Sequence, residues 1–156
     1  MKKRVGDSLT ENAYFVQSSH INGYGRLFGG DLMRWMDVVA GIVSRRHCGK
    51  EITTAAIDQL VFKEPAFVND IVVLVGKITY VGRSSMEVRV DAFVEEREDG
   101  TRRLINHAYF VMVAIDENGK PIEVPGLVLE NENQQIEWEG GKKRYLLRKD
   151  RKLEGY

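Results

Sequence analysis

A pair of glycines in this sequence is well suited to chemistry on a carbonyl group. Gly29 and Gly30 stand at the first turn of an expected helix, where glycine costs about 1 kcal/mol relative to alanine. The free amides of a first turn point outward with the positive end of the helix dipole. The Gly30 amide is therefore suited to hold a carbonyl oxygen as it gains negative charge. The alternative is that the two glycines let the helix start pack tightly under a sheet, and these residues alone leave both interpretations open.

Asp37 is the carboxylate most usefully placed beside them, about two turns further along the same helix. It lies at the rim of the apolar arc of that helix, between Met33 and Ala40. A carboxylate held there can act as a general base on water or as a nucleophile on a carbonyl carbon. Arg34 and Ser44 belong to a polar stripe beside it, so an ordinary solvated Asp is the simpler interpretation of the residues alone.

The helix that carries these residues is predicted from Phe28 to about Arg46. Leu32, Met36 and Val39 recur at three- and four-residue steps, and further apolar residues widen the arc beyond the stripe that a surface helix needs. A sheet is therefore expected to wrap the helix. Gly49 suits the left-handed conformation that ends a helix.

The rest of the expected architecture is extended chain. Val, Ile, Thr, Tyr and Phe are abundant in four runs that predict long strands, Ile52–Phe62, Ile71–Val81, Met86–Glu96 and Leu104–Ile115. Asp99-Gly100 and Gly82-Arg83 supply turns, so these neighbouring strands are expected to pair antiparallel. With a short strand at Tyr14–Gln17 before the helix, helix and sheet are segregated, which predicts the α+β class.

Composition limits the classes of function. The chain has 156 residues, near the common size of one domain, and its 23 Lys and Arg balance 23 Asp and Glu, so no nucleic-acid or membrane partner is favoured. Cys48 is the sole cysteine, which excludes an intramolecular disulfide and a thiolate zinc site. We expect a cytoplasmic protein, because no apolar N-terminal run resembles a signal peptide and no stretch reaches the roughly 18 residues of a membrane-spanning helix.

The C-terminal segment differs in character from the rest of the chain. Residues 1–126 are interpreted as the domain and residues 127–156 as a peripheral charged tail, rich in Lys and Arg from Lys142 onward. A solvated and partly helical end is the favoured interpretation of this tail. Capping of the sheet, packing on a neighbouring subunit and contact with phosphates are the alternatives.

Four separated motifs resemble acyl-CoA hydrolases of the hotdog superfamily in their order and spacing. The first is the run Asn22, Gly25, Leu27-Phe28-Gly29-Gly30, Met33 and Met36-Asp37. The others are Phe62-Lys63-Glu64-Pro65 with Val68-Asn69-Asp70, then Val81-Gly82-Arg83-Ser84-Ser85-Met86, and finally Phe110 to Asp116 before Gly119-Lys120-Pro121. Because four pieces match in register between Asn22 and Pro125, the family assignment is strong.

The resemblance implies a hotdog fold, in which a long central helix is wrapped by a mainly antiparallel sheet of five to six strands. It further implies a homodimer whose sheets join edge to edge, with shared active sites between the subunits, and a hexamer built as a trimer of dimers. In this family an Asp on the helix is the catalytic acid or base, which by position is Asp37. An Asn before the helix contributes from the facing subunit, and Asn22 matches it, although Asn in a Gly-rich loop is also an ordinary turn former.

The resemblance also implies where coenzyme A (CoA) is held. Gly82, Arg83, Ser84 and Ser85 match the turn that cradles its pantetheine and phosphates, and Gly29 and Lys63 are expected to contact it as well. A guanidinium and hydroxyls presented together suit a phosphate, whereas Arg83 alone would be read as a solvated hairpin arginine. The substrate is then an acyl-CoA, and neither a metal nor an organic cofactor is expected. His47 and His107 have no Ser or Cys partner in a recognisable motif and are interpreted as structural.

The leading hypothesis for the function is therefore an acyl-CoA thioesterase. A dehydratase ranks below it, because dehydratases of this fold use a catalytic His in the helix region, and His47 lies near the helix end instead of its start. A non-catalytic acyl-CoA sensor or binding module is the alternative from a different class. Departures from the family pattern at His20-Ile21, Tyr24 and Arg26 bear on the acyl-chain preference, which the sequence does not resolve.

Overall fold

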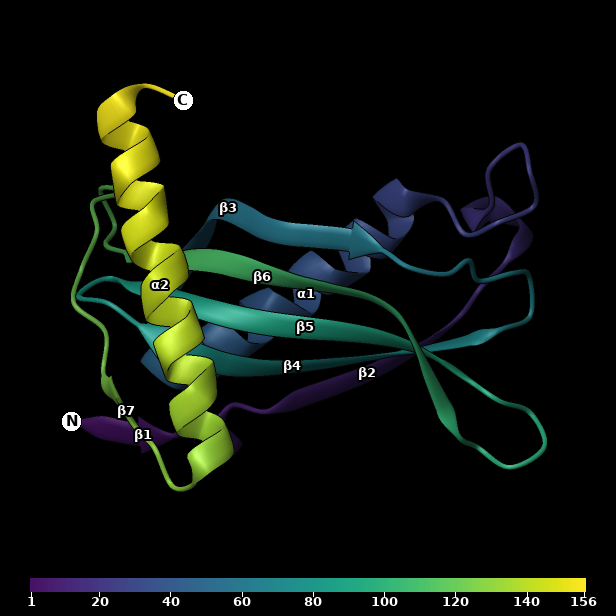
Figure 1. The fold of residues 1–156 in the computed structure, drawn as a ribbon, viewed down its shortest axis with the longest axis horizontal. Coiled ribbons are helices and arrows are strands. Elements are labelled where there is room, and N and C mark those ends of the chain that lie inside the picture. The colour runs from purple at the N-terminus through teal and green to yellow at the C-terminus, as the bar shows by residue number, and fades with distance from the viewer.

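The computed structural model describes residues 1–156 and has one long helix laid across a five-stranded antiparallel sheet (Figure 1). The strand order is β2-β4-β5-β6-β3, so β2 and β3 are the two edges of the sheet. The bounds of its strands are β2 Thr10–Phe15, β3 Glu51–Phe62, β4 Ile71–Val81, β5 Ser85–Glu95 and β6 Arg102–Ile115. The predicted α+β class and the helix wrapped by an antiparallel sheet are both confirmed.

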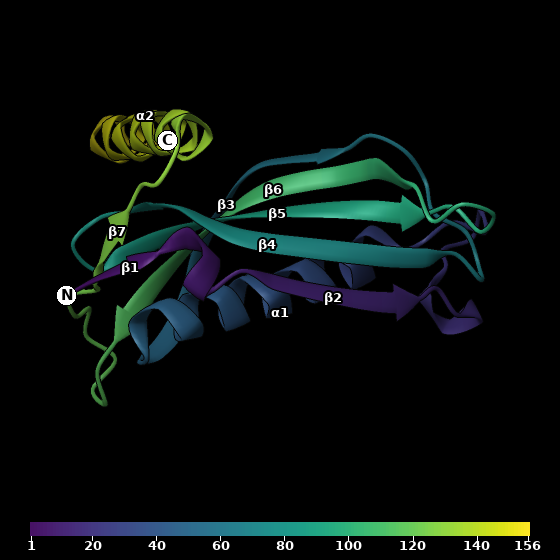
Figure 2. The ribbon, with the colours of Figure 1, turned by 90° about the horizontal axis from the view of Figure 1, so that it is seen from below.

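Helix α1, Gly29–Cys48, lies on the concave face of the sheet (Figure 2). Met36, Val39 and Val43 are completely buried between the two layers, as the wide apolar arc predicts. A Cβ atom on Gly76 of β4 would lie 2.6 Å from a methyl group of Val39, so glycine there lets the helix approach the strand closely. Gly49 ends the helix with φ 67°, the expected left-handed cap.

Edge strand β2 departs most from the prediction, whereas β3 matches its predicted bounds within one residue. Strand β2 begins and ends earlier than the Tyr14–Gln17 strand that the sequence indicates. Strand β3 is irregular, with register shifts against β6 between Thr54 and Ala56 and between Asp58 and Val61. Gln59, at the second shift, has a positive φ of 54°, a conformation that few residues other than glycine adopt.

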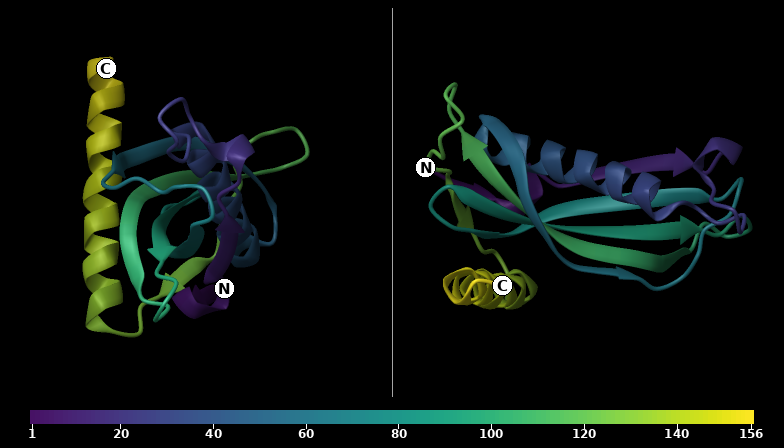
Figure 3. Two further views of the ribbon diagram at one scale, coloured as in Figure 1. Left: turned by 90° about the vertical axis from the view of Figure 1, so that its right-hand side faces the viewer. Right: turned by 90° about the horizontal axis from the view of Figure 1, so that it is seen from above.

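The C-terminal segment folds as helix α2, Glu132–Glu154, against the face of the sheet opposite α1 (Figures 2 and 3). The prediction of a solvated, partly helical tail is wrong in this respect, because outward-facing side chains of the sheet supply partners for it. Trp138 packs on Tyr80 of β4 with ring centroids 4.5 Å apart, and Arg144 forms an ion pair with buried Glu87 of β5. The helix therefore caps the sheet, one of the alternatives considered for the tail.

A second, two-stranded sheet joins the N-terminus of the chain to the segment that precedes α2. Strand β1, Lys2–Arg4, pairs parallel with β7, Gly126–Val128, just before α2. The domain boundary at residue 126 stays a prediction, and strand β7 crosses it. Neither helix is sufficiently long and apolar to span a membrane.

Candidate active site

Asp37 and Thr54 form a polar pair between the middle of α1 and edge strand β3. The Thr54 hydroxyl donates a hydrogen bond of 2.7 Å to Oδ1 of Asp37. Asp37 is half-buried, forms no ion pair, and has Met36 and Val38 as its helix neighbours. The bond orients the carboxylate and leaves its second oxygen free, so Asp37 can accept a proton from water or attack a carbonyl carbon.

The first turn of α1 presents two backbone amides without a hydrogen-bond acceptor in the chain. The amides of Asp31 and Leu32 both donate to the carbonyl of Phe28, whereas those of Gly29 and Gly30 form no such bond. A Cβ atom on Gly30 would lie 2.5 Å from the ring of Phe28, and one on Gly29 would lie 3.3 Å from the ring of Phe62. Both interpretations of the glycines therefore retain support, since the amides are free and aromatic rings pack closely over them.

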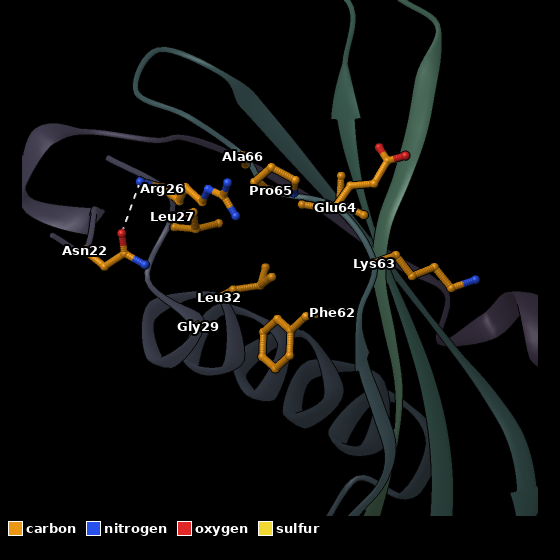
Figure 4. Close-up of a pocket in the computed structure, with 11 residues that line it drawn as sticks. Asn22, Arg26, Leu27, Gly29, Leu32, Phe62, Lys63, Glu64, Pro65 and Ala66 are labelled. Atoms are coloured by element: carbon orange, nitrogen blue, oxygen red, sulfur yellow. Dashed lines mark hydrogen bonds between the residues drawn. The ribbon is translucent and has the colours of Figure 1, made fainter. Parts of the chain in front are cut away.

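Asn22 holds the loop before the helix. Its Oδ1 accepts a hydrogen bond of 2.9 Å from the amide of Tyr24. It also accepts one of 3.3 Å from the amide of Arg26, which is the dashed line in Figure 4. Within one chain Asn22 thus behaves as a turn former. Its Nδ2 group makes no hydrogen bond in the chain and remains available as a donor to a ligand.

A cavity of about 350 Å³ opens between this loop, the start of α1 and the end of β3 (Figure 4). Its wall is mixed, with Leu32, Phe62 and Ile105 among the apolar residues. The guanidinium of Arg26 extends toward the cavity, whereas the side chain of Lys63 points away from it (Figure 4). Asn22 and Gly29 also line the cavity, so the structure brings together three residues that the sequence assigns to the site, Asn22, Gly29 and Lys63.

Asp37 does not line this cavity. It stands seven positions after Gly30, which corresponds to about 10 Å along the helix axis. The cavity beside the first turn of α1 and the Asp37–Thr54 pair therefore lie at different places in one chain. One chain therefore holds two separate halves of the predicted catalytic set.

The predicted CoA-binding turn, Gly82–Ser85, joins β4 and β5 at the other end of the sheet from the cavity (Figure 1). Its carbonyls are fixed, because Arg83 accepts from the Val124 amide at 2.8 Å and Ser84 accepts from the Ala114 amide at 3.0 Å. The Arg83 side chain is exposed and has no ion-pair partner. This turn is well separated from the Asn22 cavity of the same chain.

The turn does lie near the Asp37 half of the site. Ser85 pairs with Val113 of β6, and Val113 pairs in turn with Thr53, the residue before Thr54. Two strand spacings, or about 10 Å, therefore separate Ser85 from the strand that orients Asp37.

His47 and His107 lie away from the Asp37–Thr54 pair. His47 is completely buried, with Nε2 2.8 Å from the carbonyl oxygen of Pro125, and burial lowers its pKa below the ordinary value. Burial and the nearby Arg89 guanidinium also lower the pKa of His107. No group of three or more His, Cys, Asp or Glu side chains is arranged to hold a metal ion.

Comparison with known proteins decides the family. Residues 24–101 match the thioesterase superfamily, and a Bacillus subtilis relative, an uncharacterized acyl-CoA thioester hydrolase, is 40% identical over 131 residues, which cover 84% of this chain and 76% of the relative. The chain belongs to the thioesterase superfamily. The cytosolic acyl-CoA thioester hydrolase of rat is another superfamily relative, 33% identical over 91% of this chain, although the match spans only 38% of that longer protein.

Solved structures of the superfamily share the fold, which confirms the hotdog resemblance. An acyl-CoA hydrolase from Staphylococcus aureus, solved with butyryl-CoA and CoA, gives a TM-score of 0.93 at 30% identity, covering 99% of this chain and 94% of that one. A hexameric acyl-CoA thioesterase, solved without ligand, gives 0.91 at 33% identity and covers 96% of each chain.

Further structures of the Staphylococcus aureus enzyme carry alanine in place of one Asn, one Asp or one Thr. The Asn and the Asp are 15 positions apart in that chain, and the Asp and the Thr are 17 positions apart. The same separations relate Asn22 to Asp37 and Asp37 to Thr54. Sequence reasoning missed Thr54, because a Thr in a strand carries no mark of function and the predicted β3 did not show which Thr faces the helix. The Thr53-Thr54 pair opposite Asp37 was the available signal.

Proposed function

We propose that this chain is an acyl-CoA thioesterase, which hydrolyses an acyl-CoA to a free fatty acid and CoA. The observation that carries the proposal is the Asp37 carboxylate, oriented by Thr54 at 2.7 Å in a chain whose relatives are named acyl-CoA hydrolases. The matching separations of the Asn, Asp and Thr substituted in the Staphylococcus aureus enzyme support the same three residues here.

In the proposed reaction Asp37 acts as general base or as nucleophile. As a base it takes a proton from water while the water oxygen attacks the thioester carbonyl carbon; the carbon–sulfur bond then breaks and the CoA thiolate is protonated. As a nucleophile its free oxygen forms a mixed anhydride and expels the thiolate, and water then releases the acid. Thr54 acts as a positioning residue, and the Gly30 amide stabilises the negative carbonyl oxygen. Neither route requires a metal or an organic cofactor.

The proposal requires a homodimer with shared sites. Asp37 and Thr54 of one subunit would face Gly30 and Asn22 of the other, because about 10 Å of helix separates the two halves in one chain. Several solved neighbours are hexameric, which supports a hexamer built as a trimer of dimers. Light scattering checks this assembly, and a stable, active monomer at low micromolar concentration would refute the shared site.

The CoA portion is proposed to contact Gly82, Arg83, Ser84 and Ser85, together with Gly29 and Lys63. Arg83 supports this assignment, since its exposed guanidinium has no partner and stands on a turn with a fixed backbone. A cytoplasmic location is also proposed, in keeping with mammalian relatives named cytosolic hydrolases.

The decisive experiment measures CoA release from a panel of acyl-CoAs with a thiol reagent, for the native protein and for Asp37→Asn. We expect catalytic turnover in the native protein and a loss of at least about 100-fold in the variant, the lower end of what a positioned acid or base contributes. Asp99→Asn is the matched control, because Asn-Gly also suits that exposed hairpin turn. Acyl-CoA binding without turnover would instead identify a non-catalytic binding module, and kcat near the native value in Asp37→Asn would refute the mechanism.

A further inference from the structure

The unpaired side-chain polar groups around the Asn22 cavity are all hydrogen-bond donors. The Arg26 guanidinium extends toward the cavity and forms no ion pair (Figure 4). Asn22 adds its free Nδ2 group, since backbone amides occupy only its Oδ1. Glu64, the one acidic residue that lines the cavity, forms an ion pair with Arg103 of β6. The cavity therefore offers donors and a positive charge to a ligand, while its one carboxylate is already neutralised.

The backbone of Arg26 is fixed at the rim of this cavity. The Asn22 amide donates a hydrogen bond of 2.8 Å to the Arg26 carbonyl, and the Arg26 amide donates to Oδ1 of Asn22. The next residue, Leu27, donates a bond of 2.8 Å to the carbonyl of Ala66, in the segment after β3. Because Lys63 points away from the cavity, Arg26 is the one cation directed at it (Figure 4).

Much of the remaining cavity wall is apolar. Leu32, Phe62 and Ile105 line it and suit methylene groups, which gain free energy when they leave water. A guanidinium beside such side chains is costly to desolvate unless an anion pairs with it. A hydrocarbon chain that ends in an anion complements both features of the cavity.

We infer that this cavity holds the acyl chain of the substrate and that Arg26 selects chains whose far end carries a carboxylate. The inference rests on the proposed function and names its substrate class, the CoA thioesters of dicarboxylic acids. Gly29 lines the cavity beside Gly30, whose amide is proposed to bind the thioester carbonyl, so the chain attached to that carbonyl enters the cavity. A carboxylate accepts two parallel hydrogen bonds from a guanidinium, whereas a methyl group leaves the guanidinium without a partner.

Two six-carbon substrates test the selection. Adipyl-CoA and hexanoyl-CoA differ only at the far end of the acyl chain, which is a carboxylate in the first and a methyl group in the second. We expect the native protein to hydrolyse adipyl-CoA with a kcat/KM about tenfold higher or more, because hydrogen bonds between charged groups discriminate at least that strongly. CoA release with a thiol reagent gives both values. A native protein without a preference for adipyl-CoA would overturn the inference.

Substitution of Arg26 tests whether it is the selecting residue. Arg26→Gln should lower the adipyl-to-hexanoyl ratio of kcat/KM by about tenfold or more, and Arg26→Lys should retain part of the ratio because it keeps the charge. Arg26→Glu should favour hexanoyl-CoA, since like charges repel. The ratio does not depend on the fraction of folded enzyme in a sample, because both substrates are measured on the same sample.

Arg97→Gln is the matched control for these variants. Arg97 is also exposed and forms no ion pair, but it does not line the cavity, so its loss should leave the ratio unchanged. A native ratio in Arg26→Gln, or an equal fall in Arg97→Gln, would overturn the role of Arg26.

The same measurements distinguish the acyl carboxylate from the phosphates of CoA. Both substrates carry identical phosphates, so loss of a phosphate contact would raise KM for both alike and would weaken the binding of free CoA in calorimetry. That outcome would overturn the assignment of Arg26 to the acyl chain.

Failure of the inference is distinct from failure of the proposed function. Hydrolysis of hexanoyl-CoA and adipyl-CoA at equal rates would retain the function and overturn the selection. A protein that hydrolyses neither would refute the function for these substrates, and calorimetry would then test the selection by itself. Tighter binding of adipyl-CoA than of hexanoyl-CoA, lost in Arg26→Gln, would support it, and equal binding would overturn it.

Discussion

Replacement of Arg144 by Met should strongly destabilise the protein, because Arg144 neutralises a buried carboxylate. Its guanidinium donates to both oxygens of Glu87, at 2.9 and 2.8 Å, and Thr79 donates a further bond of 2.7 Å. The Glu87 side chain is 1% exposed and that of Arg144 is 13% exposed. Removing one partner of a buried pair costs about 3–5 kcal/mol, since the remaining charge stays desolvated. The guanidinium also lies 3.6 Å from the ring centroid of Tyr109, so its loss removes a cation–π contact.

Urea denaturation at a fixed protein concentration measures this loss, since the stability of an oligomer depends on concentration. The same loss lowers the melting temperature by roughly 6–20 °C for a chain of this size. Lys143→Met is the control, because its exposed side chain forms no ion pair and its removal should change stability by less than about 0.5 kcal/mol. Adding Glu87→Gln to Arg144→Met should recover part of the loss, since a neutral amide is less costly to bury. A loss below about 1 kcal/mol in Arg144→Met would refute tight docking of α2.

Three further predictions concern catalysis and pH. Thr54→Val should lower kcat by about tenfold or more with little change in CoA binding, because it removes the hydroxyl that orients Asp37. Steady-state kinetics measure kcat, and calorimetry measures CoA binding. An unchanged kcat would exclude the positioning role of Thr54. Arg83→Ala should raise KM for acyl-CoA more than it lowers kcat, with added salt partly mimicking the change; a collapse of kcat at constant KM would mean that Arg83 organises the catalytic centre. Burial lowers the pKa of His47, so below the ordinary value of 6.5 the unfolded chain binds the proton more readily than the folded chain. The free energy of unfolding should therefore decrease as the pH is lowered through this range. Denaturant titrations across that range should show a smaller slope in His47→Gln, and equal slopes would contradict this account.

Local patterns were sufficient to predict the layers of the fold. The apolar residues of α1 recur because one helix packs on one sheet, and Asp99-Gly100 forms a hairpin because glycine accepts the positive φ of 72° found at Gly100. Helix α2 was misjudged for a physical reason. Its sheet-facing side is held by Arg144 and Trp138 instead of an apolar stripe, and charged residues on a helix are ordinarily read as a solvated face.

The relative positions of the proposed site residues could be predicted from the sequence where a helix fixes their spacing. Gly30 and Asp37 share one helix, so their separation follows from its rise per residue. The contact between Thr54 and Asp37 depends on the register in which β3 pairs with β6, and on the register shift after Thr54. The pattern of residues in the sequence shows neither the register nor the shift. The same spacing that made the positions of Gly30 and Asp37 predictable also keeps them about 10 Å apart along the helix of one chain, and for this reason the proposed mechanism takes the Gly30 amide from a second copy.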